Sequence, residues 1–155
     1  MDLILWRHAD AEDGANDLAR ELTPEGEKQA ARVAGWLLQR LPSRFLLVSS
    51  PAARAQQTAQ ALGVPVRTAR EIAPGAAVST ILKAAGWPNT GGPSYGETVV
   101  LVGHQPDLGQ AVGFLVGGGR SSVSLKKGAL WWLSDRARDE GAQVVVRAVI
   151  SPDLL

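Results

Sequence analysis

Two histidines and two arginines occupy positions from which they can act on a phosphate group. His8 and His104 are the two histidines of the chain, and each follows a short apolar run. Arg7 precedes His8, and Arg54 lies a few residues after a third apolar run, where a helix is expected to begin. A neutral imidazole can attack phosphorus, and the planar guanidinium group of arginine matches phosphate oxygens in pairs. These residue types indicate phosphoryl transfer, provided that the fold brings them together.

Each of these residues, taken singly, has a plainer explanation. A histidine after a strand is usually a hydrogen-bonded structural residue, and an arginine in a first helical turn is usually solvated. Their combination, which uses every histidine of the chain, favours a shared site. The charge of Arg7 also disfavours the imidazolium form of His8, which leaves a lone pair for attack.

Strand and helix signals alternate along the chain. Buried strands are expected where short apolar runs occur, at residues 3–6, 45–48, 64–66 and 98–102. Helices are expected where apolar residues recur at helical spacing between proline or glycine signals, at residues 24–41, 51–62, 76–85 and 106–116. The tail predicts further strands at residues 123–125, 129–133 and 144–149, with a polar turn near residues 135–141. Glycine and proline predict a surface loop at residues 87–96.

This alternation predicts an α/β fold. We expect a three-layer α/β/α sandwich with a mostly parallel central sheet, in a single domain over residues 1–155, to which the tail adds one or two antiparallel strands. Ligands of such sheets bind at the carboxyl ends of the strands. His8, His104 and Arg54 all follow strand ends, so we expect them at one edge of the sheet, where the helix N-terminus beside Arg54 adds amide donors.

The composition of the 155 residues excludes several classes of protein. A net charge of +1 gives no broad basic surface for nucleic acid, and the absence of cysteine excludes disulfides and thiolate catalysis. Two histidines without paired acidic ligands are a poor metal site, so we expect no metal and no cofactor. Without a leader-like segment or a long apolar stretch, we expect a cytoplasmic protein that does not bind membranes, and a monomer.

Several motifs resemble those of the histidine phosphatase superfamily, whose fold is phosphoglycerate mutase-like. Arg7-His8-Ala9 resembles its Arg-His-Gly signature, with alanine, which resists positive φ, in place of glycine. Residues 49–59, which contain Arg54, and residues 102–107, which contain His104, resemble its second and third motifs. Residues 20–26 and the tail at 151–155 are similar to segments of the SixA-type phosphohistidine phosphatases. The resemblance covers nearly the whole chain, in the family's order, and implies this fold without large lid insertions.

The resemblance also implies roles for individual residues. His8 would be the catalytic nucleophile, Arg7, Arg20 and Arg54 would bind the phosphoryl oxygens, and His104 would donate a hydrogen bond to the same group. Arg20 is assigned through the resemblance alone, because an arginine in a loop is otherwise a plain surface residue. The wider superfamily uses a carboxylic acid to protonate the leaving oxygen, and Glu71 occupies a similar segment; Asp10 and Asp107 are alternatives, and Asp107 also fits a helix start.

These roles imply a two-step hydrolysis through phosphorylated His8 that needs no metal, since arginines supply the positive charge. A phosphorylated imidazole leaves readily without an assured acid, whereas an alkoxide needs one. We therefore expect a phosphohistidine-bearing protein as the substrate. Three alternatives stay open: a phosphomonoesterase for small molecules, a non-catalytic phosphate-binding module, and a metal-binding protein that uses both histidines.

Overall fold

Two parallel strands, β1 (Asp2–Arg7) and β4 (Thr98–Gly103), form the centre of the sheet in the computed structural model, which describes residues 1–88, 98–119, 121–138 and 141–155. The other strands are β2 (Leu46–Ser49), β3 (Arg67–Thr68), β5 (Leu130–Arg138) and β6 (Gly141–Ile150). The sheet order is β3-β2-β4-β1-β5-β6, in which β5 and β6 run antiparallel and the others parallel. The expected mixed sheet with an antiparallel tail is confirmed.

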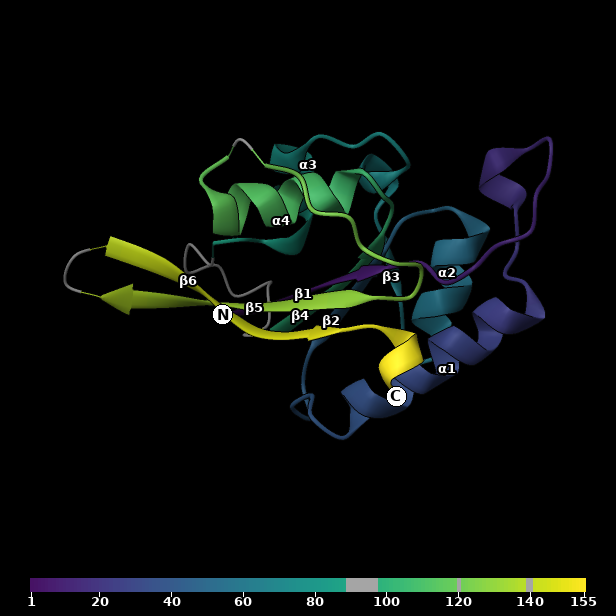
Figure 1. Ribbon diagram of the computed structural model, residues 1–155, viewed down its shortest axis with the longest axis horizontal. Coiled ribbons are helices and arrows are strands. Elements are labelled where there is room, and N and C mark those ends of the chain that lie inside the picture. The colour runs from purple at the N-terminus through teal and green to yellow at the C-terminus, as the bar shows by residue number, and fades with distance from the viewer. Residues whose placement is uncertain (89–97, 120, 139–140) are drawn as a thin grey trace.

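Both faces of β1 are covered, which explains why its sequence is a continuous apolar run rather than an alternating one. Leu3 and Leu5 pack into one core with α3 (Val78–Ala85) and α4 (Asp107–Gly117). Ile4 and Trp6 pack into a second core with α1 (Pro24–Leu38) and α2 (Ala53–Gln60). Figure 1 shows α3 and α4 above the sheet and α1 below it. The expected three-layer sandwich is confirmed.

Most helix ends lie close to their sequence signals. Thr23 accepts a hydrogen bond from the amide of Gly26, and a proline opens α1. Gly86 and Gly118 end α3 and α4 in the left-handed conformation, with φ of 66° and 73°. The start of α2 differs, because the helix begins at Ala53 rather than directly after Ser50-Pro51.

Two expected strands are wrong. The strand expected at residues 64–66 lies instead at Arg67–Thr68, because β3 pairs only with the last two residues of β2. The segment at residues 123–125 is not a strand. It lies along α4, where the amide of Val123 donates to the carbonyl of Gly109 at 3.0 Å. A Cβ on Gly109 would come within 1.9 Å of the Val123 carbonyl, so glycine makes this contact possible.

Other expectations fall partly outside the described residues. Trp87, at the start of the expected loop, is buried in the core with α3, and residues 89–96 of that loop are not described. The expected turn near residues 135–141 is narrower, since β5 extends to Arg138 and β6 begins at Gly141, with residues 139–140 undescribed. No helix in the described segments is long and apolar enough to cross a membrane. The single domain over residues 1–155 stays a prediction.

A close approach between α1 and the loop after β1 depends on Gly26. A Cβ at this position would lie 2.0 Å from the backbone carbonyl of Asp10. We expect Gly26→Ala to lower the free energy of unfolding by about 2 kcal/mol or more, because backbone must move to relieve the clash. Urea unfolding at neutral pH measures this change.

Gly35→Ala is the matched control on the same helix, where an added Cβ meets no atom within 4 Å. Alanine is favoured over glycine in a helix by about 0.8–1 kcal/mol, so this variant should be slightly more stable than the wild type. Equal destabilisation by both substitutions would contradict the close approach.

Candidate active site

The pairing register of β1 with β4 brings the two histidines together. Arg7 lies opposite Gly103, and the amide of His8 donates to the Gly103 carbonyl at 3.0 Å. His8 and His104 therefore leave neighbouring strand ends side by side, with ring centroids 5.2 Å apart. The expectation that the carboxyl ends of the strands would join these two residues agrees with this arrangement.

The hydrogen bonds of His8 define which ring nitrogen carries the proton. Nδ1 lies 2.7 Å from the carbonyl oxygen of Ala9. A carbonyl oxygen can only accept, so Nδ1 is the donor and Nε2 carries the lone pair. Arg54 Nε donates to this Nε2 at 3.3 Å. The free nitrogen of His8 therefore points toward a cation, as a nucleophile for an anionic group would.

The alanine that follows His8 introduces no backbone strain. Within the described segments, every residue with a positive φ is a glycine. Ala9 is fully buried, and its amide donates to Thr58 Oγ1 at 3.0 Å. Alanine therefore replaces the family's glycine without disturbing the His8 loop.

His104 has its own fixed orientation. Its Nε2 lies 2.7 Å from Ser50 Oγ, and its Nδ1 lies 3.4 Å from Arg54 Nη2. Arginine nitrogens only donate, so Nδ1 accepts and Nε2 donates to the serine hydroxyl. Arg54 thus donates to the unprotonated nitrogens of both histidines.

Both imidazoles are neutral at physiological pH. Burial and, to a lesser extent, the charges of Arg54, Arg7 and Arg20 lower the pKa of His8 to about 4, against the opposing effect of the Ala9 hydrogen bond. Burial lowers the pKa of His104 to about 3, with His8 and Arg54 as the next causes. Neutral rings keep the lone pairs that nucleophilic attack and proton uptake require.

Arg54 is buried, with 3% of its surface exposed, and it occupies the first turn of α2 as expected. Its Nη1 donates to the backbone carbonyl of Asp17 at 2.7 Å, and its Nη2 donates to Asp17 Oδ2 at 3.1 Å. Arg20 donates through Nε and Nη2 to the other carboxylate oxygen at 3.1 and 3.0 Å. Asp17 therefore joins two of the expected phosphate-binding residues.

The guanidinium group of Arg7 is bound by the segment that precedes β5. Its Nη1 donates to the carbonyl of Leu125 at 2.5 Å. Its Nε is buried and has no hydrogen-bond partner among the described residues. Burial also lowers the pKa of this guanidinium from its usual value. A buried donor without a partner is costly, and an anionic ligand near it would lessen that cost.

A pocket of about 350 Å³ lies in front of these groups. It brings together the sequence-predicted residues Arg7, His8, Arg20, Arg54 and His104. The rest of its lining consists of Ala11, Asp13, Asp17, Pro74, Gln105 and Lys127. Positive charge therefore predominates around the free nitrogen of His8, which suits an oxyanion.

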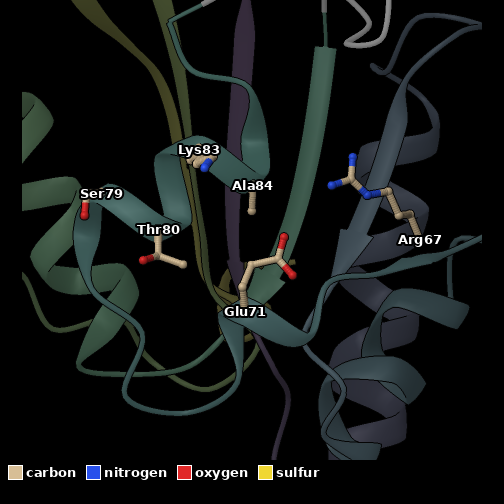
Figure 2. A pocket seen from close by; sticks show the side chains of 6 residues that line it. All are labelled: Arg67, Glu71, Ser79, Thr80, Lys83 and Ala84. Atoms are coloured by element: carbon tan, nitrogen blue, oxygen red, sulfur yellow. The ribbon is translucent and has the colours of Figure 1, made fainter.

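The expected carboxylic acids lie elsewhere. Glu71, in the short helix η2 (Arg70–Ile72), lines a different pocket of about 440 Å³ between β3 and α3. Figure 2 shows its carboxylate pointing into that pocket, between Arg67 and the side chains of α3. Its role as general acid stays a prediction that no contact with His8 supports.

The two alternative carboxylates are engaged by other groups. Asp10 accepts from Lys127 at 2.5 Å and from Thr23 at 2.8 Å. Asp107 is buried at the start of α4 and accepts from the amides of Gly75 and Ala76, so it fixes the loop before α3. Neither is among the described residues that line the His8 pocket.

Sequence reasoning missed three residues of this site. Ser50 was interpreted as a helix start, but its hydroxyl binds His104. Asp17 lies three residues before Arg20 and forms an ion pair with it. This spacing is typical of ion pairs and could have predicted the contact from the sequence. Lys127 lines the pocket and precedes Gly128, whose φ is 73°. A glycine there indicates a turn, but it does not indicate a binding site.

In the described part of the chain, no three His, Asp or Glu side chains are grouped to hold a metal ion.

Comparison with known proteins decides the family. The model of the histidine phosphatase superfamily (branch 1) matches residues 3–75. The structure of SixA from Nakamurella multipartita is similar over 97% of this chain and 96% of that one, with a TM-score of 0.75 and 27% identity. The chain belongs to the histidine phosphatase superfamily, and within it to the SixA type.

Two further relatives agree with this assignment. The protein histidine phosphatase SixA, solved in complex with tungstate, matches over 99% of both chains with a TM-score of 0.78 and 25% identity. An uncharacterised protein of Picosynechococcus sp. is 36% identical over 119 residues, which are 71% of this chain and 70% of the relative. This histidine phosphatase is accordingly an enzyme that hydrolyses phosphoryl groups, and a phosphorylated substrate is its partner.

The neutral histidines make stability depend on pH. Because burial lowers both pKa values below the unfolded value near 6.5, the unfolded chain binds more protons between about pH 6.5 and 4. The contribution of the neutral histidines to the free energy of unfolding should therefore be complete above about pH 6.5. The free energy of unfolding should fall as the pH is lowered toward 4. Urea unfolding at several pH values measures this slope.

The double variant His8→Asn/His104→Asn is the control, since asparagine does not titrate in this range. Its free energy of unfolding should vary less between about pH 6.5 and 4 than that of the wild type. An identical slope in the two proteins would show that other groups cause the dependence.

Proposed function

We propose that this histidine phosphatase removes the phosphoryl group from phosphohistidine on another protein, by transferring it to Nε2 of His8. The observation that carries the proposal is the orientation of His8, whose Nδ1 is held by the Ala9 carbonyl while its unprotonated Nε2 faces Arg54 in the pocket. The names of two similar structures support the substrate class, since one names SixA as a phosphohistidine phosphatase and the other names it as a protein histidine phosphatase.

The first step transfers the phosphoryl group. His8 Nε2 attacks phosphorus in line, and a new N–P bond forms as the P–N bond of the substrate breaks. The substrate imidazole leaves with that electron pair and takes a proton from solvent. Arg7, Arg20 and Arg54 bind the phosphoryl oxygens and offset their charge, so positioning and electrostatics lower the barrier without a metal.

The second step restores the enzyme. Water attacks the phosphorus of phosphorylated His8, and Nε2 departs with its electron pair, leaving a neutral ring. The proton lost by the water is shared between phosphate and solvent. The Ala9 carbonyl holds Nδ1–H through both steps, so the ring returns to the same tautomer.

His104 can take part by accepting a proton. Its Nδ1 is unprotonated and near Arg54, and burial and neighbouring charges hold its pKa at about 3. The negative charge of a bound phosphoryl group opposes this lowering, so His104 can take the proton of that group and then donate it back as a hydrogen bond. Ser50 Oγ accepts from Nε2–H at 2.7 Å, which stabilises the imidazolium that forms. Ser50 therefore acts as a positioning residue for His104.

The carboxylates near the pocket favour a P–N bond over an ester. Asp13 and Asp17 line it, but hydrogen bonds from Arg20 and Arg54 lower the pKa of Asp17, which makes it a poor proton donor. An alkoxide leaving group depends on such a donor, whereas a protonated imidazole does not. We therefore favour phosphohistidine over small phosphate esters.

The decisive assay is phosphate release from a phosphohistidine-bearing protein in the presence of EDTA. The wild type should turn over, and His8→Ala should lose at least about a thousandfold in kcat, because the proposed intermediate forms on His8 Nε2. Glu71→Gln should retain turnover, since Glu71 lines another pocket.

Three results would change this proposal. Turnover by His8→Ala would exclude His8 as the nucleophile, and loss in EDTA would exclude the metal-free reaction. Preference for small phosphate esters, with a loss of turnover in Glu71→Gln, would instead favour a phosphomonoesterase with Glu71 as its acid.

The role of Ser50 has its own test. Ser50→Ala removes the acceptor for His104 Nε2–H and should lower kcat about tenfold, the value of one hydrogen bond of about 1.4 kcal/mol. Ser49→Ala is the matched control, because Ser49 is equally buried and donates to the Ser50 carbonyl rather than to a histidine. Equal rates in the two variants would argue against the proton-accepting role of His104.

The cytoplasmic location and the monomeric state expected from the sequence stay predictions. Fractionation of cells and light scattering of the purified protein address them directly.

A further inference from the structure

A carboxylate already occupies the arginines that the proposed reaction assigns to phosphate. Asp17 Oδ2 accepts from Arg54 Nη2 at 3.1 Å, and Asp17 Oδ1 accepts from Arg20 Nη2 at 3.0 Å. Each carboxylate oxygen is bound to a different guanidinium group, as two oxygens of a phosphoryl group would be. A phosphoryl group that uses these N–H donors must first displace Asp17.

Asp17 is able to move away. Its side chain is 56% exposed, and no residue of its short helix η1 (Asp17–Ala19) is buried. Arg54 keeps a second anchor when the carboxylate leaves, because the backbone carbonyl of Asp17 accepts from Nη1 at 2.7 Å. The guanidinium of Arg54 can thus stay in place while its anionic partner is exchanged.

We propose that Asp17 is an internal competitor that sets the anion affinity and selectivity of the site. This inference rests on the proposed function of Arg20 and Arg54 in phosphoryl binding. A carboxylate ligand gains little by replacing an equivalent carboxylate. A phosphoryl dianion brings more charge and a third oxygen, which can reach Arg7 and His104. After hydrolysis, the returning Asp17 favours release of phosphate from a site with three arginines.

The test measures binding of inorganic phosphate by calorimetry at fixed ionic strength. Asp17→Asn keeps the side-chain shape and removes its charge, so phosphate should bind about fivefold more tightly than to the wild type, as expected for the loss of one exposed and one partly buried ion pair. Asp13→Asn is the matched control, because Asp13 is exposed and lines the same pocket. In the described part of the chain, Asp13 lacks the bonds to arginine that Asp17 makes.

Formate gives a second measurement that depends on the vacated position rather than on net charge. Asp17→Ala should bind formate, and formate should compete with phosphate there, whereas the wild type should show no competition at the same concentration. Such binding is expected only if formate takes the position between Arg20 and Arg54 that the Asp17 carboxylate occupies in the wild type.

Equal phosphate affinity in the wild type and Asp17→Asn would overturn the inference, as would the same gain in Asp13→Asn. Formate competition that is no stronger in Asp17→Ala than in the wild type would also overturn it. These outcomes are distinct from failure of the proposed function, which the turnover of phosphohistidine by the wild type decides separately.

Discussion

The site depends on one backbone pairing, the parallel register of β1 with β4. A shift of this register by one residue would move the amide of His8 from the Gly103 carbonyl and separate the two imidazoles. The register is held by the burial of both strands, since a one-residue slip turns every side chain to the opposite face. Leu3 and Leu5 would then enter the core that fits Ile4 and Trp6. The chemistry of His8 is thus fixed by apolar packing several residues away.

Burial and nearby charges determine the protonation state of the His8 and His104 rings. Arg54 is buried and donates to both imidazoles, and an opposite charge is available from Asp17 at the pocket surface. Burial keeps the histidines neutral, the cation in this position adds to that effect, and the cation would also attract an oxyanion. The same guanidinium group therefore helps to keep the proposed nucleophile unprotonated and would attract its anionic substrate.

The sequence predicted those features that depend on local pattern. The continuous apolar runs of β1 and β4 indicated buried parallel strands, and the expected strand ends put His8, His104 and Arg54 at one edge. The strand expected at residues 123–125 was wrong because its backbone partners are α4 and the side chain of Gln105, which no local pattern reveals. The short β3 was misplaced because its pairing is decided by where β2 ends.

Within the site, residues that act through long-range contacts were the difficult ones. The sequence around Ser50 predicts a helix cap, and its contact with His104 follows only from the fold, which brings the end of β4 beside it. Asp17 and Lys127 lie in exposed segments with ordinary composition, and their positions follow from the tertiary fold. Arg20 was found through family resemblance, because a loop arginine carries no periodic signal.

The central position of β1 has a consequence for how the protein is made. β1 is synthesised well before β4 and β5, the two strands with which it pairs. The turn before β5 also supplies the Leu125 carbonyl to Arg7 and the Gly128 amide to the His8 carbonyl. Until these segments leave the ribosome, the catalytic strand lacks its partners, and such non-local pairing forms slowly. A nascent chain therefore contains His8 long before these later segments can hold it in place, and the candidate site can form only after they have been made.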